Sequence, residues 1–395
     1  MLSILVATTS FPRWEGDYRG TFVWEGCRAM AALGARIRVV APHARGAKTR
    51  EEWNGVEVFR PRYLPERWEF LLDTPGGLPV LWDRYPSRRW TMIPFFFAHA
   101  SAVARLARDC DLVHAHWVLS AFAAVLGSPF HRRPVITTIQ GSDVYRAMRL
   151  PLAGALGRAG LRGSRRVIAL SRSLADSAAA QGVDPRKITV IPNGIDAGLF
   201  APNGKAREPV VLFVGSLIDR KGVRFLIEAM ARIRNRHPGL VLELIGDGPQ
   251  RADLEMLAAR RGLSESVRFA GILAPVEVAA RMRRAELFVL PSLEEGQGVA
   301  LLEALASGTP CVGSAVGGIR EVLSPEWGIL VPPGDAQSLA GALADLLGDA
   351  DRRYALGRAA ASGVRERYDW PVVARRILAV CGDAVSPRVG NSEQV

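Results

Sequence analysis

The stretch that decides the fold is LFVLPSLEEGQGVALLEALASGTPCVGS, residues 287–314. An apolar run, LFVLPS, ends in a loop that contains Glu295, and the triplet GQG at 296–298 then opens a helix that carries Glu303. A second apolar run, TPCVGS, follows that helix. A strand, a helix and a second strand in this order form the unit from which parallel sheets are built. The segment therefore predicts an α/β domain.

Short apolar runs alternate with amphipathic stretches in both halves of the chain. The first half contains SILVAT, RIRVVAP, VEVFRP, LVHAHW, PVITTI, RVIALS and ITVIPNG, and the second contains VVLFVGS, LVLELIG, VRFAG, LFVLPS, TPCVGS and GILVPP. The halves are joined by a polar stretch rich in Pro and Gly, which is typical of a linker. We therefore predict two domains, each with a parallel sheet covered by helices on both faces. We place the first domain at 1–198, the linker at 199–208, the second domain at 209–370, a helix that packs back toward the first domain at 371–384, and a disordered tail at 385–395.

The composition is that of a globular protein. The chain has 395 residues, of which 49% are hydrophobic and 23% charged, so it can bury the cores of two or three domains. No window holds the roughly 18 uninterrupted apolar residues of a membrane span, and the first residues lack the basic start and cleavage site of a secretory signal. The four cysteines are scattered singly, without the spacing of a zinc site or a disulfide framework. We therefore expect a cytoplasmic protein with no cofactor.

Positive charge is concentrated in the first half of the chain. Residues 1–200 carry 27 Lys and Arg against 16 Asp and Glu, whereas residues 201–395 carry 24 against 23. The basic residues are spread over many segments and form no nucleic-acid-binding motif, so we exclude nucleic acid as a partner. An excess of one sign attracts an anionic membrane surface or an anionic acceptor. A compositional preference for arginine is the alternative explanation, because only four of the 51 basic residues are lysines.

Residues 78–100, LPVLWDRYPSRRWTMIPFFFAHA, combine aromatic and arginine side chains. Such a mixture is typical of a membrane interface or of a surface for a lipid-bearing acceptor. The three consecutive phenylalanines at 95–97 are equally consistent with the core of a first-domain helix.

The loop at 294–298 and the helix after it have the features of a nucleotide site. Glycine lets backbone N–H groups approach a diphosphate closely, and the start of a helix adds a partial positive charge. A carboxylate such as Glu303 is suited to accept hydrogen bonds from paired sugar hydroxyls. Either glutamate alone would be interpreted as a solvated residue near a helix start. Together with the glycines and the later Ser-Gly-Thr-Pro and Gly-Gly, they form a composite pattern that favours the site.

This composite pattern resembles the glutamate-x7-glutamate donor motif of retaining glycosyltransferases of family 4. Further segments along nearly the whole chain resemble the same family: FPRWEGDYRGTFVWEGCRAMAALG, LVHAHW, TIQGSD, VIPNGID, FVGSLIDRKG and LIGDGP. The resemblance implies a GT-B fold, in which two Rossmann-like domains face each other across a cleft. It also implies an enzyme that moves a sugar from a nucleotide diphosphate to an acceptor with retention of configuration. The first domain would bind the acceptor and the second domain the nucleotide sugar.

The resemblance also assigns roles to individual residues. Glu303 would bind the nucleotide ribose, and Glu295 would contact hydroxyls of the donor sugar. Lys221 would neutralise the diphosphate as the glycosidic bond breaks, and His116 would touch the sugar at its reacting face. We therefore expect His116, Glu295 and Lys221 to be catalytic. Further contacts to the donor are expected from Gly296, Gln297, Gly298, Gly215, Ser216, Arg220 and Gly20, and contacts near the acceptor or sugar from Gln140, Gly141 and Asp143.

Two residues depart from the family pattern. Ser216 stands where Arg is common, which removes half of the usual diphosphate clamp unless Arg220 substitutes for it. Gln140 replaces the usual His in TIQGSD, so catalysis would not depend on a proton at that position. His114 points the same way as His116 along the strand but lies deeper, and we interpret it as structural.

We expect no metal site. Residues 109–111, Asp-Cys-Asp, spell the metal-binding Asp-x-Asp of another glycosyltransferase fold. They precede the strand LVHAHW, and so they lie at the end of the sheet opposite to the ligands.

The resemblance favours a UDP- or GDP-sugar as donor. The acceptor would be a glycolipid or polysaccharide intermediate of the cell envelope, with the protein held peripherally on the inner face of the membrane. Two alternatives stay open. One is a nucleotide-sugar epimerase of the same fold, and the other is a non-catalytic glycosyltransferase-like subunit, for which Ser216 and Gln140 are the supporting features.

Overall fold

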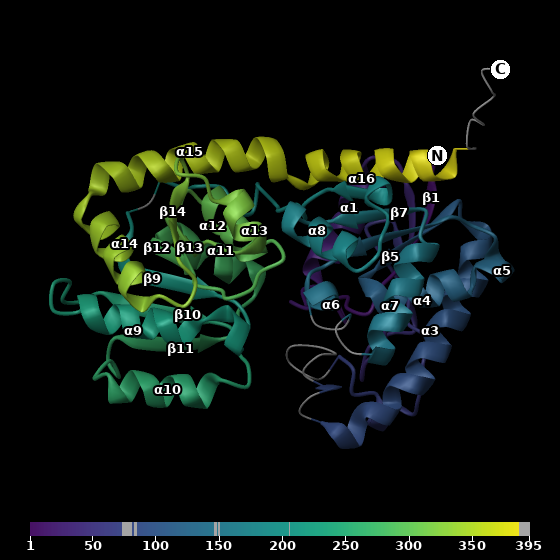
Figure 1. Ribbon diagram of the computed structural model, residues 1–395, viewed down its shortest axis with the longest axis horizontal. Coiled ribbons are helices and arrows are strands. Elements are labelled where there is room, and N and C mark those ends of the chain that lie inside the picture. Colours follow the sequence, from purple (N-terminus) through teal and green to yellow (C-terminus); the bar gives the residue numbers. More distant parts are fainter. Residues whose placement is uncertain (73–80, 83–84, 146–147, 149–150, 205, 387–395) are drawn as a thin grey trace.

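Two sheets of mainly parallel strands organise the computed structural model, which describes residues 1–72, 81–82, 85–145, 148, 151–204 and 206–386. Each sheet lies between helices, and the two domains stand side by side (Figure 1). This arrangement confirms the predicted α/β fold class with two parallel-sheet domains.

The first sheet has the strand order β3-β4-β2-β1-β5-β6-β7-β8. Its strands are β1 Ser3–Ala7, β2 Arg36–Val40, β3 Arg50–Trp53, β4 Val56–Phe59, β5 Leu112–His116, β6 Val135–Ile139, β7 Arg166–Ala169 and β8 Ile188–Val190. The helices between them are α1 Thr21–Ala32, α3 Met92–Leu106, α4 Trp117–Leu126, α5 Ser128–His131, α6 Ser142–Tyr145, α7 Pro151–Gly163 and α8 Arg172–Ala180. Strands β5 and β6 are buried along their whole length, as expected for the centre of a sheet covered on both faces.

The edge strand β3 was not predicted, because REEW has no apolar run. It pairs antiparallel with β4, with Trp53 opposite Val56. The turn between them is Asn54-Gly55, and both residues have positive φ angles, of 47° and 78°. An Asn-Gly pair with this geometry is a strong hairpin signal, and it identifies the strand where hydropathy does not.

The second sheet has the order β11-β10-β9-β12-β13-β14, and all its strands are parallel. Its strands are β9 Glu208–Val214, β10 Val241–Ile245, β11 Val267–Gly271, β12 Ala285–Leu290, β13 Cys311–Ser314 and β14 Gly328–Val331. Its helices are α9 Val223–Ile233, α10 Arg251–Arg260, α11 Pro275–Arg284, α12 Val299–Ala306, α13 Gly317–Val322, α14 Ala336–Gly348 and α15 Ala350–Tyr368.

The last described helix, α16 Trp370–Val385, leaves the second domain and packs on the first (Figure 1). Trp370 anchors it: a Cβ on Gly194 would lie 2.6 Å from the indole, and one on Gly26 of α1 would lie 3.2 Å from it. Val373 and Ala374 join the same buried cluster as the strands β1 and β2. Most of the predicted tail, residues 387–395, lies outside the described residues.

No helix within the described ranges has the length and apolar character that crossing a bilayer requires.

Candidate functional site

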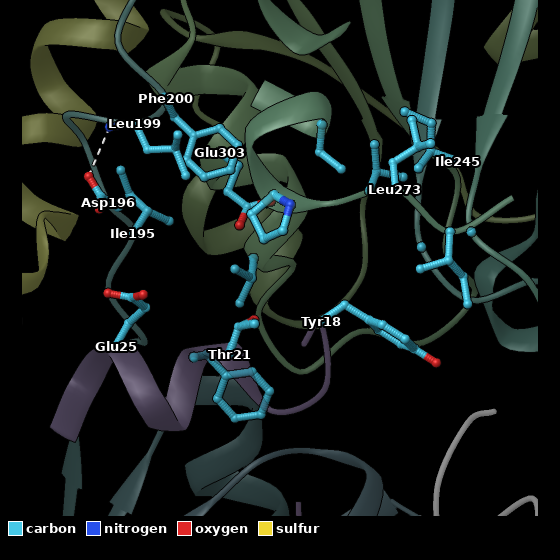
Figure 2. A pocket seen from close by; sticks show the side chains of 18 of the residues that line it. Tyr18, Thr21, Glu25, Ile195, Asp196, Leu199, Phe200, Ile245, Leu273 and Glu303 are labelled. Carbon is cyan, nitrogen blue, oxygen red and sulfur yellow. Dashed lines mark hydrogen bonds between the residues drawn. The ribbon is translucent and has the colours of Figure 1, made fainter. Parts of the chain in front are cut away.

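A cleft of about 330 Å³ lies between the two domains, lined by residues that follow strands of both sheets. Tyr18 and Thr21 come from the loop and helix after β1, whereas Gly215 and Ser216 follow β9 in the second domain. Figure 2 shows the Glu303 side chain turned into this cleft, opposite Tyr18 and Thr21. Ligands of open α/β sheets bind at the carboxyl ends of the strands, so the cleft is the expected place for a ligand.

Glycines allow the loops of the second domain to lie in close backbone contact. A Cβ on Gly246 would overlap the carbonyl oxygen of Gly215, and one on Gly222 would overlap that of Pro291. Gly222 has a φ of 64°, which favours glycine for a second reason. The loop after β9 therefore lies directly on the loop after β12.

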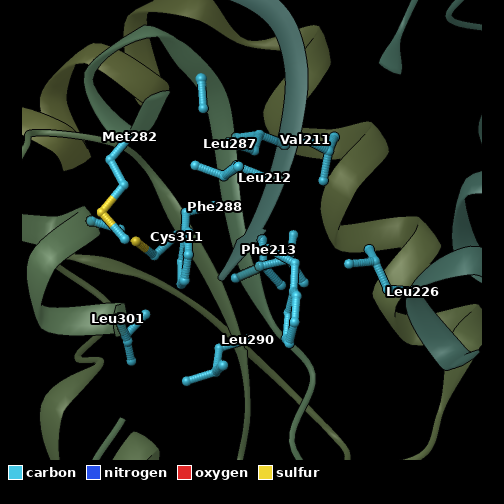
Figure 3. Close-up of a cluster of buried hydrophobic side chains, with 14 of the residues drawn as sticks. Val211, Leu212, Phe213, Leu226, Met282, Leu287, Phe288, Leu290, Leu301 and Cys311 are labelled. Atoms are coloured by element: carbon cyan, nitrogen blue, oxygen red, sulfur yellow. The ribbon is translucent and has the colours of Figure 1, made fainter. Parts of the chain in front are cut away.

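The strands that carry these two loops are held rigid by a large core. Buried side chains of β9 and β12, including Phe213 and Phe288, pack with Leu226, Leu301 and Cys311 in the second domain (Figure 3). Because such a core is closely packed and rigid, it fixes the positions of the loops that follow these strands.

This loop contact brings Lys221 to Glu295. The Lys221 ammonium pairs with the Glu295 carboxylate, which also accepts a hydrogen bond from Ser292 Oγ at 3.3 Å. Burial raises the pKa of Glu295, but the charges of Lys221 and Arg220 outweigh burial and hold that pKa below its usual value. Glu295 is thus a carboxylate, and Arg220 is close enough to act on it electrostatically.

Glu303 is in a different electrostatic environment. Burial raises the pKa of its carboxyl to about 8, and no cation offsets this effect in the described structure. Its side chain faces the open cleft (Figure 2). Such a group gains from hydroxyl donors that stabilise its charged form.

The loop at residues 296–298 rests on a pair of glycines that the sequence analysis noted without assigning a role. A Cβ on Gly318 would lie 2.5 Å from Gln297 Cα, and one on Gly317 would overlap the Glu295 carbonyl oxygen. Gly298, with a φ of 86°, is the N-cap of α12. The first amide groups of a helix have no partner within it, and they give this end a partial positive charge.

His116 ends β5 with its ring beside those of two neighbours. The His114 and His116 ring centroids are 4.5 Å apart, and His114 Nε2 bonds Thr138 Oγ1 at 2.7 Å. Burial lowers the pKa of His116 well below its usual value, and His114 lowers it further. Trp117, the next residue, has a φ of 64°, a strained conformation for a bulky side chain. His114 is fully buried, in agreement with its structural interpretation.

The remaining predicted residues fall into two groups. Gln140 bonds His116, and Gly141 packs on the loop at residues 296–298, since a Cβ there would lie 3.1 Å from Gly296 Cα. Gly20 lies at the N-cap of α1 with a φ of 57°, and a Cβ there would lie 2.6 Å from the Ser10 carbonyl oxygen. Its close approach is therefore to its own domain's backbone. The Asp143 side chain is not among the described parts of the structure.

Searched over its described residues, the chain brings together no cluster of three or more His, Cys, Asp or Glu that would hold a metal ion. Asp109 pairs with Arg38, and Asp111 accepts a hydrogen bond from the Ser3 amide at 2.7 Å. Both contacts lie at the amino end of the sheet, away from the cleft.

Comparison with known proteins agrees with this geometry. Two family models match successive parts of the chain: Glycosyltransferase Family 4 at residues 20–199 and Glycosyl transferases group 1 at 199–362. The chain is 30% identical over 393 residues to the GDP-mannose-dependent alpha-(1-6)-phosphatidylinositol monomannoside mannosyltransferase of Mycolicibacterium smegmatis, covering 93% of this chain and 95% of that protein. This chain belongs to the family 4 glycosyltransferases.

Another relative and several solved structures are also similar to this family 4 chain. It is 36% identical over 276 residues to the glycogen synthase of Mycobacterium tuberculosis. The aligned residues cover 67% of this chain and 66% of that protein, so the chain spans about two thirds of the length of this relative. Sucrose-phosphate synthase from Thermosynechococcus elongatus superposes with a TM-score of 0.80 at 24% identity, covering 97% of this chain and 99% of that one. The Anabaena protein HepE in complex with UDP-glucose gives 0.76 at 19% identity, covering 97% and 100%. These likenesses establish the GT-B arrangement.

Two residues of this family 4 chain bridge the domains and were missed by the sequence analysis. Asn193 lies within the quoted segment VIPNGID, yet its contacts to Gln140 and Gln297 could not be read from the pattern. Glu321 of the second domain accepts hydrogen bonds from the backbone N–H groups of Arg172 and Ser173, at 2.8 and 2.9 Å, at the start of α8. A carboxylate is favourable at a helix N-terminus, so this contact helps to hold the domains together.

Proposed function

We propose that this chain transfers a sugar from a nucleotide-diphosphate donor to an acceptor, with retention of anomeric configuration and without a metal ion. One observation carries the proposal. The interdomain cleft places Glu303 in the same cavity as Gly215, and the Lys221 side chain lies against Gly215 while pairing with Glu295. The Glu303 carboxyl group, which would bind the ribose hydroxyls, thus lies on the same side of the cleft as Lys221, which would bind the diphosphate.

In the proposed reaction each group has one task. Glu303 accepts hydrogen bonds from the ribose hydroxyls, and the first turn of α12 contributes its amide groups to the diphosphate. Lys221 stabilises the negative charge that grows on the diphosphate as the glycosidic bond breaks. The departing diphosphate oxygen takes the proton of the acceptor hydroxyl on the same face of the sugar. Glu295 and His116 hold the sugar at its hydroxyls and at its reacting face.

The nature of the donor and acceptor is part of the proposal. The Mycolicibacterium relative is named for GDP-mannose and phosphatidylinositol monomannoside, and the HepE structure contains UDP-glucose. We propose a UDP- or GDP-sugar as donor and a glycolipid or polysaccharide intermediate of the cell envelope as acceptor.

A surface on the first domain supports a lipid-bearing acceptor and a peripheral place at an anionic membrane. Trp68 and Trp90 meet edge to face with ring centroids 6.2 Å apart, and Arg67 lies 4.7 Å from the Trp68 ring. Two more arginines stack on aromatic rings beside them: Arg89 on Trp82, and Arg88 on Tyr85 and Phe70. We call these residues the aromatic–arginine surface. Such side chains favour the interface between water and an anionic bilayer.

Helix α3 extends this surface, and its three consecutive phenylalanines differ in burial. Phe95 is buried against Tyr63, and Phe96 stacks on Phe122. Ile93 and Phe97 are 63% and 66% exposed, one helical turn apart. The run therefore serves both as core and as surface. Residues 78–80 and 83–84 of the same segment lie outside the described residues.

The proposed activity is tested by incubating the full-length protein with a panel of labelled UDP- and GDP-sugars, with and without a membrane extract. Transfer predicts that nucleotide is released and that label enters the extract, with turnover retained in excess chelator. An altered sugar with no acceptor would indicate an epimerase. Binding without turnover for every donor would indicate a non-catalytic subunit. Loss of turnover in chelator, restored by magnesium or manganese, would contradict metal independence.

A further inference from the structure

A chain of amide side chains runs from His116 in the first domain to Gln297 in the second. Gln140 Nε2 donates to His116 Nδ1 at 3.0 Å, and Gln140 Oε1 accepts from Asn193 Nδ2 at 3.3 Å. Gln297 then binds the backbone of Asn193 twice. Its Oε1 accepts from the Asn193 N–H at 2.7 Å, and its Nε2 donates to the Asn193 carbonyl at 3.0 Å. The hydrogen-bonded chain therefore crosses the domain boundary.

The direction of these hydrogen bonds defines the state of the His116 ring. A backbone N–H only donates and a carbonyl only accepts, so the Gln297 amide has one orientation. The Asn193 backbone does not orient the Gln140 amide. The structure itself places Gln140 Oε1 against Asn193 Nδ2, which turns the Gln140 NH₂ group toward His116. An NH₂ group has no lone pair to offer, so His116 Nδ1 is the acceptor and the ring proton is on Nε2.

Burial makes this arrangement costly to rearrange. Gln297, Asn193 and His116 are 3%, 7% and 8% exposed. An unpaired polar group in such surroundings loses its hydrogen bonds to water without replacement. Withdrawal of Gln297 would leave both backbone groups of Asn193 without these partners. The donor loop, which also carries Glu295, is thereby linked to the orientation of His116.

We propose that Gln140, Asn193 and Gln297 are positioning residues that keep His116 in the Nε2–H tautomer while the two domains are in contact. The inference rests on the proposed function, in which His116 touches the donor sugar at its reacting face. Among the described residues, nothing hydrogen-bonds His116 Nε2. The ring lines the small cavity beside Phe22 and Trp370, not the cleft that Glu303 lines, so a substrate must reach it from that side. Gln297 binds the Asn193 backbone across the domain boundary, and the Asn193 side chain in turn binds the Gln140 amide that faces His116.

The titratable groups in the small cavity beside the His116 ring are neutral, so no charge there opposes the hydrogen bond from Gln140. The titratable side chains that line the small cavity beside the ring are His114 and Cys27. Burial lowers the pKa of His114 to about 4 and raises the pKa of the Cys27 thiol. Both are therefore uncharged at neutral pH.

Nitrogen NMR of the full-length protein with ¹⁵N-labelled histidine tests the tautomer directly. The chain has six histidines, and a His116→Gln variant assigns the signal. We expect a protonated Nε2 and an unprotonated Nδ1 for His116 in the wild-type protein. Gln140→Glu replaces the NH₂ donor by a carboxylate that only accepts, so the proton should move to Nδ1 and the pKa of His116 should rise. An Nδ1–H signal in the wild type, or an unchanged spectrum in Gln140→Glu, overturns the proposal.

Kinetics test whether the link to the second domain matters. Gln297→Met keeps the size of the side chain and removes both bonds to Asn193. We expect kcat to fall about tenfold with the donor KM nearly unchanged, because the reacting group is displaced while the nucleotide contacts remain. At saturating donor, Gln140→Glu should add an ionisation to the pH profile of kcat near neutral pH.

Gln181→Met is the matched control, since in the described part of the chain the Gln181 amide bonds the Val144 and Ser177 carbonyls of its own domain. Equal losses in Gln297→Met and Gln181→Met would contradict the link. If the wild-type protein transfers no sugar, the proposed function fails, and the NMR result alone decides on the tautomer.

Discussion

The two domains present different kinds of surface. On the second domain, glycine loops lie in backbone contact, and a few charged side chains, Lys221, Glu295 and Glu303, are held between them. On the first domain, Arg67, Arg88 and Arg89 stack on the rings of the aromatic–arginine surface. Close packing fixes a few groups to high precision, whereas exposed stacked arginines adapt to an extended partner. Under the proposed function, the difference favours a rigid donor side and an adaptable acceptor side.

The strongest test of the donor side is Lys221→Ala. Because a preorganised cation stabilises the charge that develops on the diphosphate, we expect kcat to fall by about 10² to 10³. Steady-state kinetics with the best donor from the panel measure this loss. Arg224→Ala, which removes an exposed arginine three residues away, should leave kcat nearly unchanged. If kcat of Lys221→Ala stayed within threefold of the wild-type value, the proposed role of Lys221 in stabilising the diphosphate would be contradicted.

Glu303 should make donor binding depend on pH. Its pKa of about 8 means that below this pH the carboxyl is mostly protonated and accepts fewer hydrogen bonds from ribose hydroxyls. Donor binding should favour the ionised form, so affinity should rise with pH and level off above about 8. Between pH 6 and 8 we expect a change of roughly tenfold or more, measured by calorimetry with an intact nucleotide sugar. Glu303→Gln should bind weakly and show no such slope; a slope that persists would point to another group.

Glycine substitutions test how closely the loop at residues 296–298 is packed. Gly318→Ala should lower the free energy of unfolding by about 1–3 kcal/mol, because its Cβ would strike the backbone at Gln297. Gly341→Ala, in α14 with open space around it, should instead raise stability by roughly 0.5–1 kcal/mol through helix propensity. Denaturant unfolding of both variants gives the comparison. Equal effects would show that the donor loop tolerates movement.

The smallest expected effect concerns the aromatic–arginine surface. Phe97→Ser and Ile93→Ser should each weaken binding of the full-length protein to anionic vesicles by several-fold, since each removes about 1–2 kcal/mol of buried apolar contact. Tyr354→Ser and Val276→Ser are the matched controls, being 72% and 64% exposed on the second domain. Binding is measured by co-sedimentation and should decline as salt rises. Equal losses of binding in the control variants, or equal binding to neutral vesicles, would contradict the membrane proposal. The excess of basic residues would then be explained by a compositional preference for arginine.

The parallel strands and their order along the chain could be predicted from the sequence because a strand buried on both faces needs a local apolar run. The edge strand β3 could not be predicted in this way, since one of its sides faces solvent and its residues are charged. Its signal was the Asn-Gly turn, a backbone requirement that hydropathy ignores.

The candidate site was predicted only as a set of residues. Motifs named Lys221, Glu295 and Glu303. They did not show that the first two pair, or that no cation among the described residues offsets burial at Glu303. Likewise Gln140 was noted for the proton it lacks, whereas its partners, His116 and Asn193, became visible only in the fold.

The amino-acid sequence by itself determined the two-domain α/β class and the residue types available at each strand end, because periodicity and glycine placement act over a few neighbouring positions. Only the tertiary structure decided which of those residues meet. Lys221 and Glu295 are 74 positions apart, and Asn193 and Gln297 are 104 apart. Their charges and proton positions depend on burial and on partners that the packing of whole domains brings close. No local sequence pattern shows which residues separated by so many positions will meet.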